Sequence, residues 1–167
     1  MSWGRFAIAL GLVYVFQIGA ASLLGWSHLD PFLIMAVIYG LTAPRHDARI
    51  AAWLAGLAQD LGSADALGVH AFTLGLTGLF VTKLREVGNV NVWWVRGLIM
   101  LAAAWPGQAL YLFHLHYWSG AGAASFSALL FKATIVSAIA AAAALVVTAL
   151  PSFGRRPRRG RFRTFVE

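Results

Sequence analysis

The side chains in this chain that could do chemistry are few, and most lie in or beside three connections between long apolar stretches. They are three aspartates, four histidines and one lysine, namely Asp30, Asp60, Asp65, His28, His70, His114, His116 and Lys132. If the apolar stretches cross a membrane, an ionisable group at the depth of Asp60 or Lys132 is by default a functional candidate. A lysine there can instead extend its long stem to the interface. We keep both interpretations, and we also consider an ion pair between Asp60 and Lys132 that would hold their two segments together.

The His114-Leu115-His116 sequence resembles a metal-binding pair at first sight. On a helix, however, residues two apart point to different faces, and a chelating pair needs a spacing of three or four. Tyr117 and Trp118 follow directly, which is typical of a membrane interface. We therefore expect neither a metal site nor a bound cofactor.

The recognisable catalytic patterns are missing from the sequence. There is no cysteine, no His-Glu-x-x-His helix, no phosphate-binding glycine loop and no carboxylate pair, and the serines have no partner base nearby in sequence. We therefore expect a protein that is not an enzyme.

The composition indicates a protein that lies mostly in hydrocarbon. Hydrophobic residues make up 60% of the 167 positions and charged residues 11%, whereas an ordinary soluble domain has about 25% charged residues. The mean hydropathy is +0.73. We expect an all-α polytopic membrane protein with six transmembrane helices in one compact bundle. The expected spans are about 5–26, 31–43, 50–62, 67–84, 92–117 and 126–150.

The second and third of these spans are short for a hydrocarbon core of about 30 Å. One alternative fuses them into a single long helix. That helix would place the charged residues of the 44–49 segment in the bilayer, where each charge costs at least about 2.5 kcal/mol. We therefore prefer two separate spans, with helices extended by flanking residues or a locally thinner bilayer.

The positive charges predict the orientation. Nearly all lysines and arginines lie on alternate connections, and the connections near 26–30, 62–66 and 117–125 have none; Lys132 is the exception. Because short cytoplasmic loops retain positive charge, we expect residues 1–150 to cross the membrane six times, with both termini in the cytoplasm.

Residues 151–167 form a basic tail. It contains six arginines, Arg155, Arg156, Arg158, Arg159, Arg161 and Arg163. Arginines beside a membrane gain about 1 kcal/mol each from anionic head groups. We expect contact with anionic lipids or an acidic cytoplasmic surface, and no nucleic-acid binding, despite the net charge of +7.

The most specific pattern lies between the third and fourth spans. It consists of Gly56, Asp60, Ser63, Leu67, Gly68 and His70. Gly56 would let two helices approach closely, Gly68 would allow a tight turn, and Asp60 could accept hydrogen bonds from the first turn of the next helix. The pattern predicts a well-capped helical hairpin, or else a polar site that a partner or small ligand recognises.

This Gly-x-x-x-Asp-Leu-x-Ser pattern, followed by Leu-Gly-Val, resembles the central signature of the rod-shape-determining MreD family. Chain length, six short-looped spans, the proline that opens the second span and the basic loop beginning at Pro44 are also similar. Family members often carry Pro-Asp before the second span, where this chain has Asp30-Pro31.

The resemblance implies a non-enzymatic scaffold subunit of the bacterial cell-elongation complex, which makes peptidoglycan, in the inner membrane. The implied partner is MreC, a single-span protein with a periplasmic domain. MreC would provide the link to MreB filaments, the RodA glycosyltransferase and a class B penicillin-binding transpeptidase, and a homodimer is left open.

The family also resembles, in helix arrangement, the S components of energy-coupling-factor vitamin transporters. The alternative function is therefore a substrate-binding transporter subunit for a small molecule. In that case Asp60, His70, His114 and Lys132 would form the mouth of the site.

Overall fold

The described residues of the protein fold as a bundle of six α-helices. The computed structural model describes residues 2–21, 30–63, 66–118 and 125–149, and within these ranges it contains no strand. The elements are α1 (Trp3–Phe16) with a π-helical turn η1 (Gln17–Ala21), α2 (Pro31–Thr42), α3 (Arg45–Gly62), α4 (Val69–Val87), α5 (Trp93–Trp118) and α6 (Phe126–Ala149). The all-α fold predicted from the sequence is confirmed.

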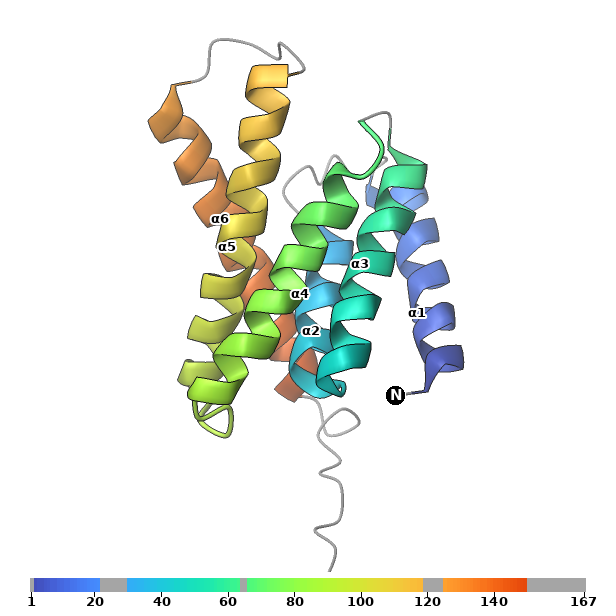
Figure 1. The fold of residues 1–167 in the computed structure, drawn as a ribbon, viewed down its shortest axis with the longest axis vertical. Helices are drawn as coiled ribbons and strands as arrows, with labels where there is room; N and C mark the ends of the chain where they lie inside the picture. The colour runs from blue at the N-terminus through green and yellow to red at the C-terminus, as the bar shows by residue number, and fades with distance from the viewer. Residues whose placement is uncertain (1, 22–29, 64–65, 119–124, 150–167) are drawn as a thin grey trace, which may run out of the picture.

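Successive helices run in opposite directions (Figure 1). The start of α1 and the end of α6 therefore lie at the same end of the bundle, which we call the lower end; the opposite end is the upper end. This arrangement agrees with six crossings that return the chain to the side where it started. Which side faces the cytoplasm stays a prediction.

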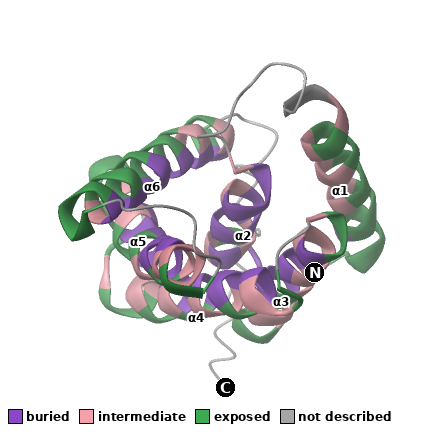
Figure 2. Cartoon of the chain, turned by 90° about the horizontal axis from the view of Figure 1, so that it is seen from above, coloured by how far each residue is buried: buried purple, intermediate pink, exposed green. Residues whose placement is uncertain are grey.

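Helix α2 lies at the centre of the bundle. Figure 2 shows α1, α3, α4, α5 and α6 as an open ring around it, with the opening between α1 and α6. Phe32, Leu33, Ala36 and Val37 on α2 are each 1% exposed or less. With 12 residues, α2 is about 18 Å long, well short of a hydrocarbon core of about 30 Å.

Side chains cap both ends of this short helix. At the upper end Asp30 Oδ1 accepts a hydrogen bond from the Leu33 N–H at 3.0 Å. At the lower end Arg85 Nη1 donates to the carbonyl oxygens of Gly40 and Ala43, each at 2.7 Å. Because unpaired backbone groups at helix ends are costly away from water, these contacts allow α2 to begin and end inside the bundle.

Helix α3 begins at Arg45, five residues before the span expected at 50–62. The expected start was set by the charges at residues 45–49, but these charges belong to the helix and have partners on α4. Arg45 pairs with Glu86 at 3.2 Å, and Arg49 Nε donates to Thr82 Oγ1 at 3.0 Å. The chain leaves helical geometry between α2 and α3, with Pro44 as the N-cap of α3, so the fused helix is excluded.

The described part of the first helix covers only part of the expected span 5–26. Helix α1 ends at Phe16 and continues as η1 to Ala21, and residues 22–29 lie outside the described part of the chain. Helix α1 is also loosely attached, since Phe6 is its only buried residue. Helix α4 is shifted by two to three residues from the expected 67–84, and α5 and α6 agree with expectation to within one residue.

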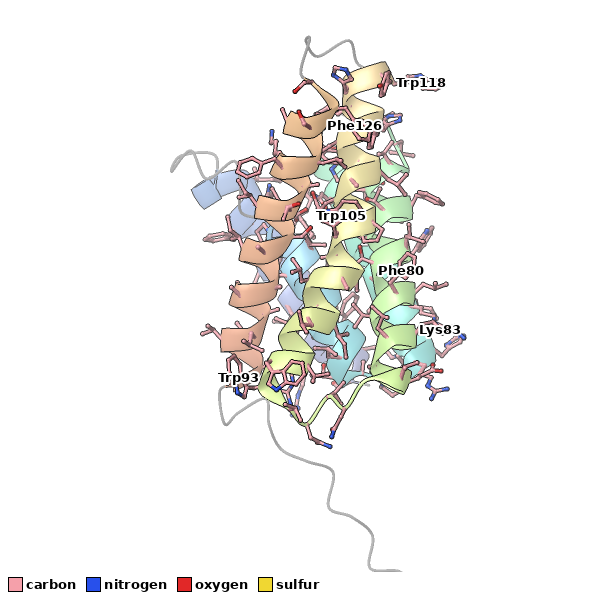
Figure 3. All side chains as sticks on the ribbon, turned by 90° about the vertical axis from the view of Figure 1, so that its left-hand side faces the viewer. Phe80, Lys83, Trp93, Trp105, Trp118 and Phe126 are labelled. Carbon is pink, nitrogen blue, oxygen red and sulfur yellow. The ribbon has the colours of Figure 1, made fainter. Side chains whose placement is uncertain are left out.

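Helices α5 and α6 are long and apolar enough to cross a membrane, at about 39 and 36 Å. Figure 3 shows Trp93 at the lower end of α5 and Trp118 at its upper end, as expected for aromatic residues at two membrane interfaces. Among the described helices α1 with its extension and α2 are apolar but shorter. That all six helices cross the bilayer stays a prediction, as does the placement of the tail at 151–167, which lies outside the described residues.

Candidate functional site

Asp60 joins the upper ends of α3 and α4. Its Oδ2 accepts hydrogen bonds from the backbone N–H groups of Gly68 (2.9 Å) and Ala71 (3.0 Å). Its Oδ1 accepts from the backbone N–H of His70 at 2.9 Å. The capping bonds expected from the sequence are therefore present. The N–H groups in the first turn of a helix have no partner within that helix. Asp60, which is only 3% exposed, accepts hydrogen bonds from these groups of α4 in place of water.

The imidazole of His70 completes this arrangement. His70 Nδ1 lies 2.9 Å from Asp60 Oδ1, and we assign the hydrogen to Nδ1 because that oxygen already acts as an acceptor. The ring of Tyr111 on α5 packs against the imidazole with centroids 4.6 Å apart. The bonds from Asp60 thus fix the position of His70, and His70 in turn connects α4 to α5.

Two glycines make the cap geometrically feasible. A Cβ atom at Gly56 would collide with the carbonyl oxygen of His70 and with the Cα of Ala71, so only glycine lets α3 approach the backbone of α4 this closely. Gly68 has φ of +98°, in the region that favours glycine, and it turns the chain directly into α4. Both roles were expected from the sequence.

The other motif residues lie at the edge of this arrangement. Ser63 is the C-cap of α3, and its Oγ donates to the carbonyl oxygen of Asp60 at 3.3 Å. Leu67 is exposed at the upper surface. Ser63 thus supports the turn, whereas Leu67 makes no contribution to the buried part of the motif.

The ion pair considered between Asp60 and Lys132 is not formed. The Asp60 side chain is fully enclosed and bound to α4, whereas Lys132 is exposed on α6. Helices α3 and α6 lie on different sides of α2 (Figure 2), which separates the two groups. The interpretation of these two residues as a pair that holds α3 to α6 is therefore wrong.

A charge-exchange experiment should show this independence. We expect Asp60→Lys to destabilise strongly, because it removes the cap, and Lys132→Asp to have a separate, smaller effect. In the double variant the two losses should add to within about 0.5 kcal/mol, as for distant sites. Thermal unfolding of the purified variants in detergent measures this, and a double variant more stable than Asp60→Lys alone would contradict it.

A second polar cluster was not foreseen from the sequence. Asp30 Oδ2 accepts weak hydrogen bonds from the side-chain amides of Gln59 on α3 (3.5 Å) and Gln108 on α5 (3.4 Å). Burial raises the pKa of the Asp30 carboxyl, and its bond from the Leu33 N–H partly opposes this rise. The sequence feature that predicts such a cluster is a glutamine within an apolar helix, because a buried side-chain amide needs a hydrogen-bond partner.

The two described histidines near the end of α5, His114 and His116, pack against aromatic neighbours. His114 stacks on Trp118 with ring centroids 5.9 Å apart, and His116 packs edge-on against Tyr117. Within the part of the chain that the structure describes, no group of three His, Asp or Glu side chains could hold a metal ion.

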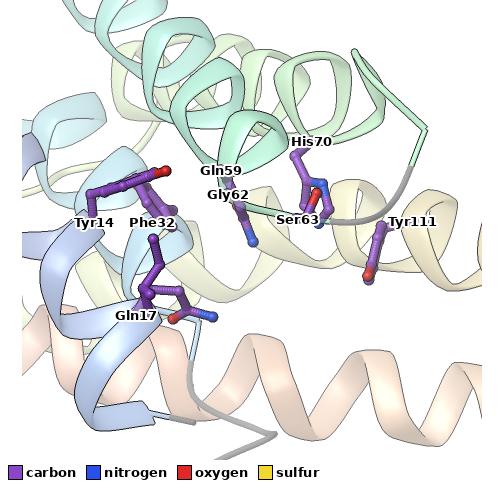
Figure 4. Close-up of a pocket in the computed structure, with 9 residues that line it drawn as sticks. Tyr14, Gln17, Phe32, Gln59, Gly62, Ser63, His70 and Tyr111 are labelled. Atoms are coloured by element: carbon purple, nitrogen blue, oxygen red, sulfur yellow. The ribbon is translucent and has the colours of Figure 1, made fainter.

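A pocket of about 230 Å³ opens beside the cap at the upper end (Figure 4). Its described lining comes from α1, η1, α2, α3, α4 and α5, and consists of Tyr14, Gln17, Ile18, Phe32, Gln59, Gly62, Ser63, His70 and Tyr111. Of the four residues expected at the mouth of a small-molecule site, His70 alone lines this pocket. Asp60 lies behind it in the cap, and His114 and Lys132 are not among the lining residues.

Comparison with known proteins gives a family match. Residues 2–150 match the family model described as rod shape-determining protein MreD. No curated protein and no solved structure gives a significant match. The matched range includes every described helix and the whole of the Asp60 cap. The chain therefore belongs to the MreD family of rod shape-determining membrane proteins.

Proposed function

We propose that the protein is a non-enzymatic scaffold subunit of the bacterial cell-elongation complex and that it binds MreC in the inner membrane. The observation that carries this proposal is the family match over residues 2–150. Through MreC the protein would act together with MreB, RodA and the class B penicillin-binding transpeptidase. The structure supports a scaffold in one respect: hydrogen bonds join α2, α3, α4 and α5 to one another.

The hairpin of α3 and α4 offers an apolar face to a partner helix. An apolar groove runs along it, lined on α3 by Trp53 and Leu57 and on α4 by Phe72, Gly75 and Leu79. Gly75 leaves room for a close backbone approach, and the larger side chains form the walls, as at interfaces between transmembrane helices. We assign this groove to the single transmembrane helix of MreC. The Asp60 cap would then keep the two walls of the groove in register.

Co-purification tests the partner and the groove together. Phe72→Ala on α4 should reduce recovery of MreC from gently solubilised membranes about tenfold, which corresponds to the loss of one aromatic anchor. Phe131→Ala on α6 is the matched control, since Phe72 is 64% exposed and Phe131 is 69% exposed. Equal recovery with both variants would reject the groove, whereas no recovery with the unmodified protein would reject MreC as a partner.

The proposed orientation places the lower end of the bundle in the cytoplasm. Arg45, Arg49 and Arg85 gather at this end, as does Lys83, which is labelled in Figure 3. The arginines of the 151–167 tail would follow on the same side and contact anionic lipids.

Reporter fusions test this orientation. Alkaline phosphatase fused after Glu167 should be inactive, because it stays in the cytoplasm, and green fluorescent protein at the same position should be fluorescent. Phosphatase inserted after Gly120, in the upper connection, is the control and should be active. An active phosphatase and a non-fluorescent protein at Glu167 would contradict the proposed orientation. The C-terminus would then lie outside the cytoplasm.

The transporter alternative has less support. Three of the four residues expected at its mouth are engaged elsewhere or exposed: Asp60 forms the cap, His114 stacks on Trp118, and Lys132 lies on the outer surface of α6. We therefore keep the scaffold as the proposed function.

A further inference from the structure

We infer that the groove between the lower halves of α5 and α6 binds one anionic phospholipid, with an acyl chain in the groove and the head group beside the start of α5. This inference goes beyond the proposed contact of the tail with lipids, because it assigns a site on the folded helices. It is independent of the proposed partner, since no described residue of this groove lines the α3–α4 groove.

The α5–α6 groove is apolar and accessible. Its described lining runs from Trp93 to Leu101 on α5 and from Ala138 to Leu145 on α6, and none of these lining residues is charged. Its volume is about 440 Å³. Trp93 is 70% exposed, and Leu98, which also lines the groove, is 55% exposed. An apolar chain that enters the groove therefore meets side chains that are open to contact.

A hydrogen bond between the two helices closes the groove above. Trp105 Nε1 donates to Thr134 Oγ1 at 3.1 Å, which links α5 to α6. These two residues lie one helical turn above Leu101 and Ala138, the uppermost lining residues on each helix, and Figure 3 places Trp105 near the middle of α5. From Trp93 to Leu101 the groove follows α5 for about 12 Å, whereas one leaflet provides about 15 Å of the hydrocarbon core. The groove thus has the length of one leaflet, as an acyl chain has.

Tryptophans mark the level of the head groups at the lower end. Trp93 lies at the lower end of α5 (Figure 3), and both Trp93 and Trp94 line the groove. Tryptophan is enriched where the hydrocarbon meets the head groups. A lipid whose chain follows the groove therefore has its head group beside the start of α5. There the N–H groups of the first helical turn have no partner within the helix and favour a negative charge such as a phosphate.

The charges of this half of the chain favour an anionic head group. The sequence contains no Asp or Glu from residue 87 to residue 166. The same range contains eight cations: Arg96 lies in the first turn of α5, six arginines follow the end of α6, and Lys132 lies nearer the upper end. Basic sites between transmembrane helices bind anionic head groups. A zwitterionic lipid has no net charge and would gain less from these cations.

Native mass spectrometry of the full-length protein in detergent micelles tests the inference, with phosphatidylglycerol as the probe. Binding should saturate at one phosphatidylglycerol for each protein. Phosphatidylcholine with the same acyl chains fills the groove equally well but carries no net charge. We expect it to bind about fivefold to tenfold more weakly.

Gly97→Leu tests the groove itself. A Cβ at Gly97 would meet nothing within 4 Å, so the helix accepts the change, and the larger side chain occupies part of the groove. Binding of phosphatidylglycerol should weaken about tenfold. Gly11→Leu on α1 is the matched control, because a Cβ there also meets nothing within 4 Å, and it should leave binding unchanged.

Equal binding of the two lipids, absence of saturation, or equal loss in the two variants would each overturn the inference. The same spectra detect dimers. A dimer that Gly97→Leu disrupts, without selective lipid binding, would assign the groove to a second copy of the chain and would also overturn it.

Discussion

Replacing Asp60 with alanine should lower the free energy of unfolding by about 3–5 kcal/mol, the largest effect that we expect from any side-chain truncation in this protein. The change removes the acceptors for three backbone N–H groups and for His70 Nδ1, all of them at a buried helix start. Each buried donor left without a partner costs about 1–3 kcal/mol. The sum is limited because the neighbouring pocket lets water reach part of the site.

Thermal unfolding in detergent checks this expectation, together with hydrogen exchange at the backbone amides of Gly68, His70 and Ala71. Those amides should exchange much faster in the variant, since their acceptor is gone. Glu86→Ala is the control, because it removes only a surface ion pair with Arg45 and should cost less than about 1 kcal/mol. Similar losses in both variants, or unchanged exchange at the three amides, would show that the cap does not stabilise the hairpin.

A methyl group added at Gly56 should be nearly as damaging. In Gly56→Ala the new Cβ would overlap the backbone of His70 and Ala71, and backbone cannot move aside as a side chain can. We expect a loss of about 2–4 kcal/mol as α3 and α4 are forced apart.

The matched control is Gly11→Ala on α1, where a Cβ would meet nothing within 4 Å. The same chemical change should there raise stability by up to about 1 kcal/mol, because alanine favours a helix more than glycine does. Opposite signs at the two positions would identify close backbone approach as the cause. A gain in stability at both positions would mean that α3 and α4 are not packed as closely as the structure shows.

The hairpin could be predicted from the sequence because its parts are close together in the chain. Asp60 and its three N–H donors lie within 11 residues of one another, so one connection and two helix ends determine their geometry. Local rules for glycine and for helix capping are sufficient at that distance.

Contacts between distant helices could not be predicted in the same way. The cluster of Asp30 with Gln59 and Gln108 joins three helices, and the Arg85 cap joins α4 to the end of α2. Both depend on the order of helices around α2, which hydropathy does not encode. For the same reason, the sequence leaves open whether Asp60 and Lys132 meet.

The early start of α3 has a different cause. A hydropathy pattern ends where charges begin, whereas a helix continues for as long as its backbone bonds and its charged side chains find partners. The bonds of Arg45 to Glu86 and of Arg49 to Thr82 are contacts between two helices, and a hydropathy pattern carries no information about such contacts.

The short central helix has an electrical consequence if the bundle spans the bilayer as we propose. A membrane voltage falls mainly across material that excludes water and mobile ions. Helix α2 at the centre of this protein is about 18 Å long, with Asp30 and Arg85 at its two ends. Where water reaches both of these ends, the layer that excludes it has about this thickness. The voltage gradient along α2 would then be steeper than in the surrounding lipid, and a charge moved from one end of α2 to the other would exchange about 2.3 kcal/mol with the field for every 100 mV.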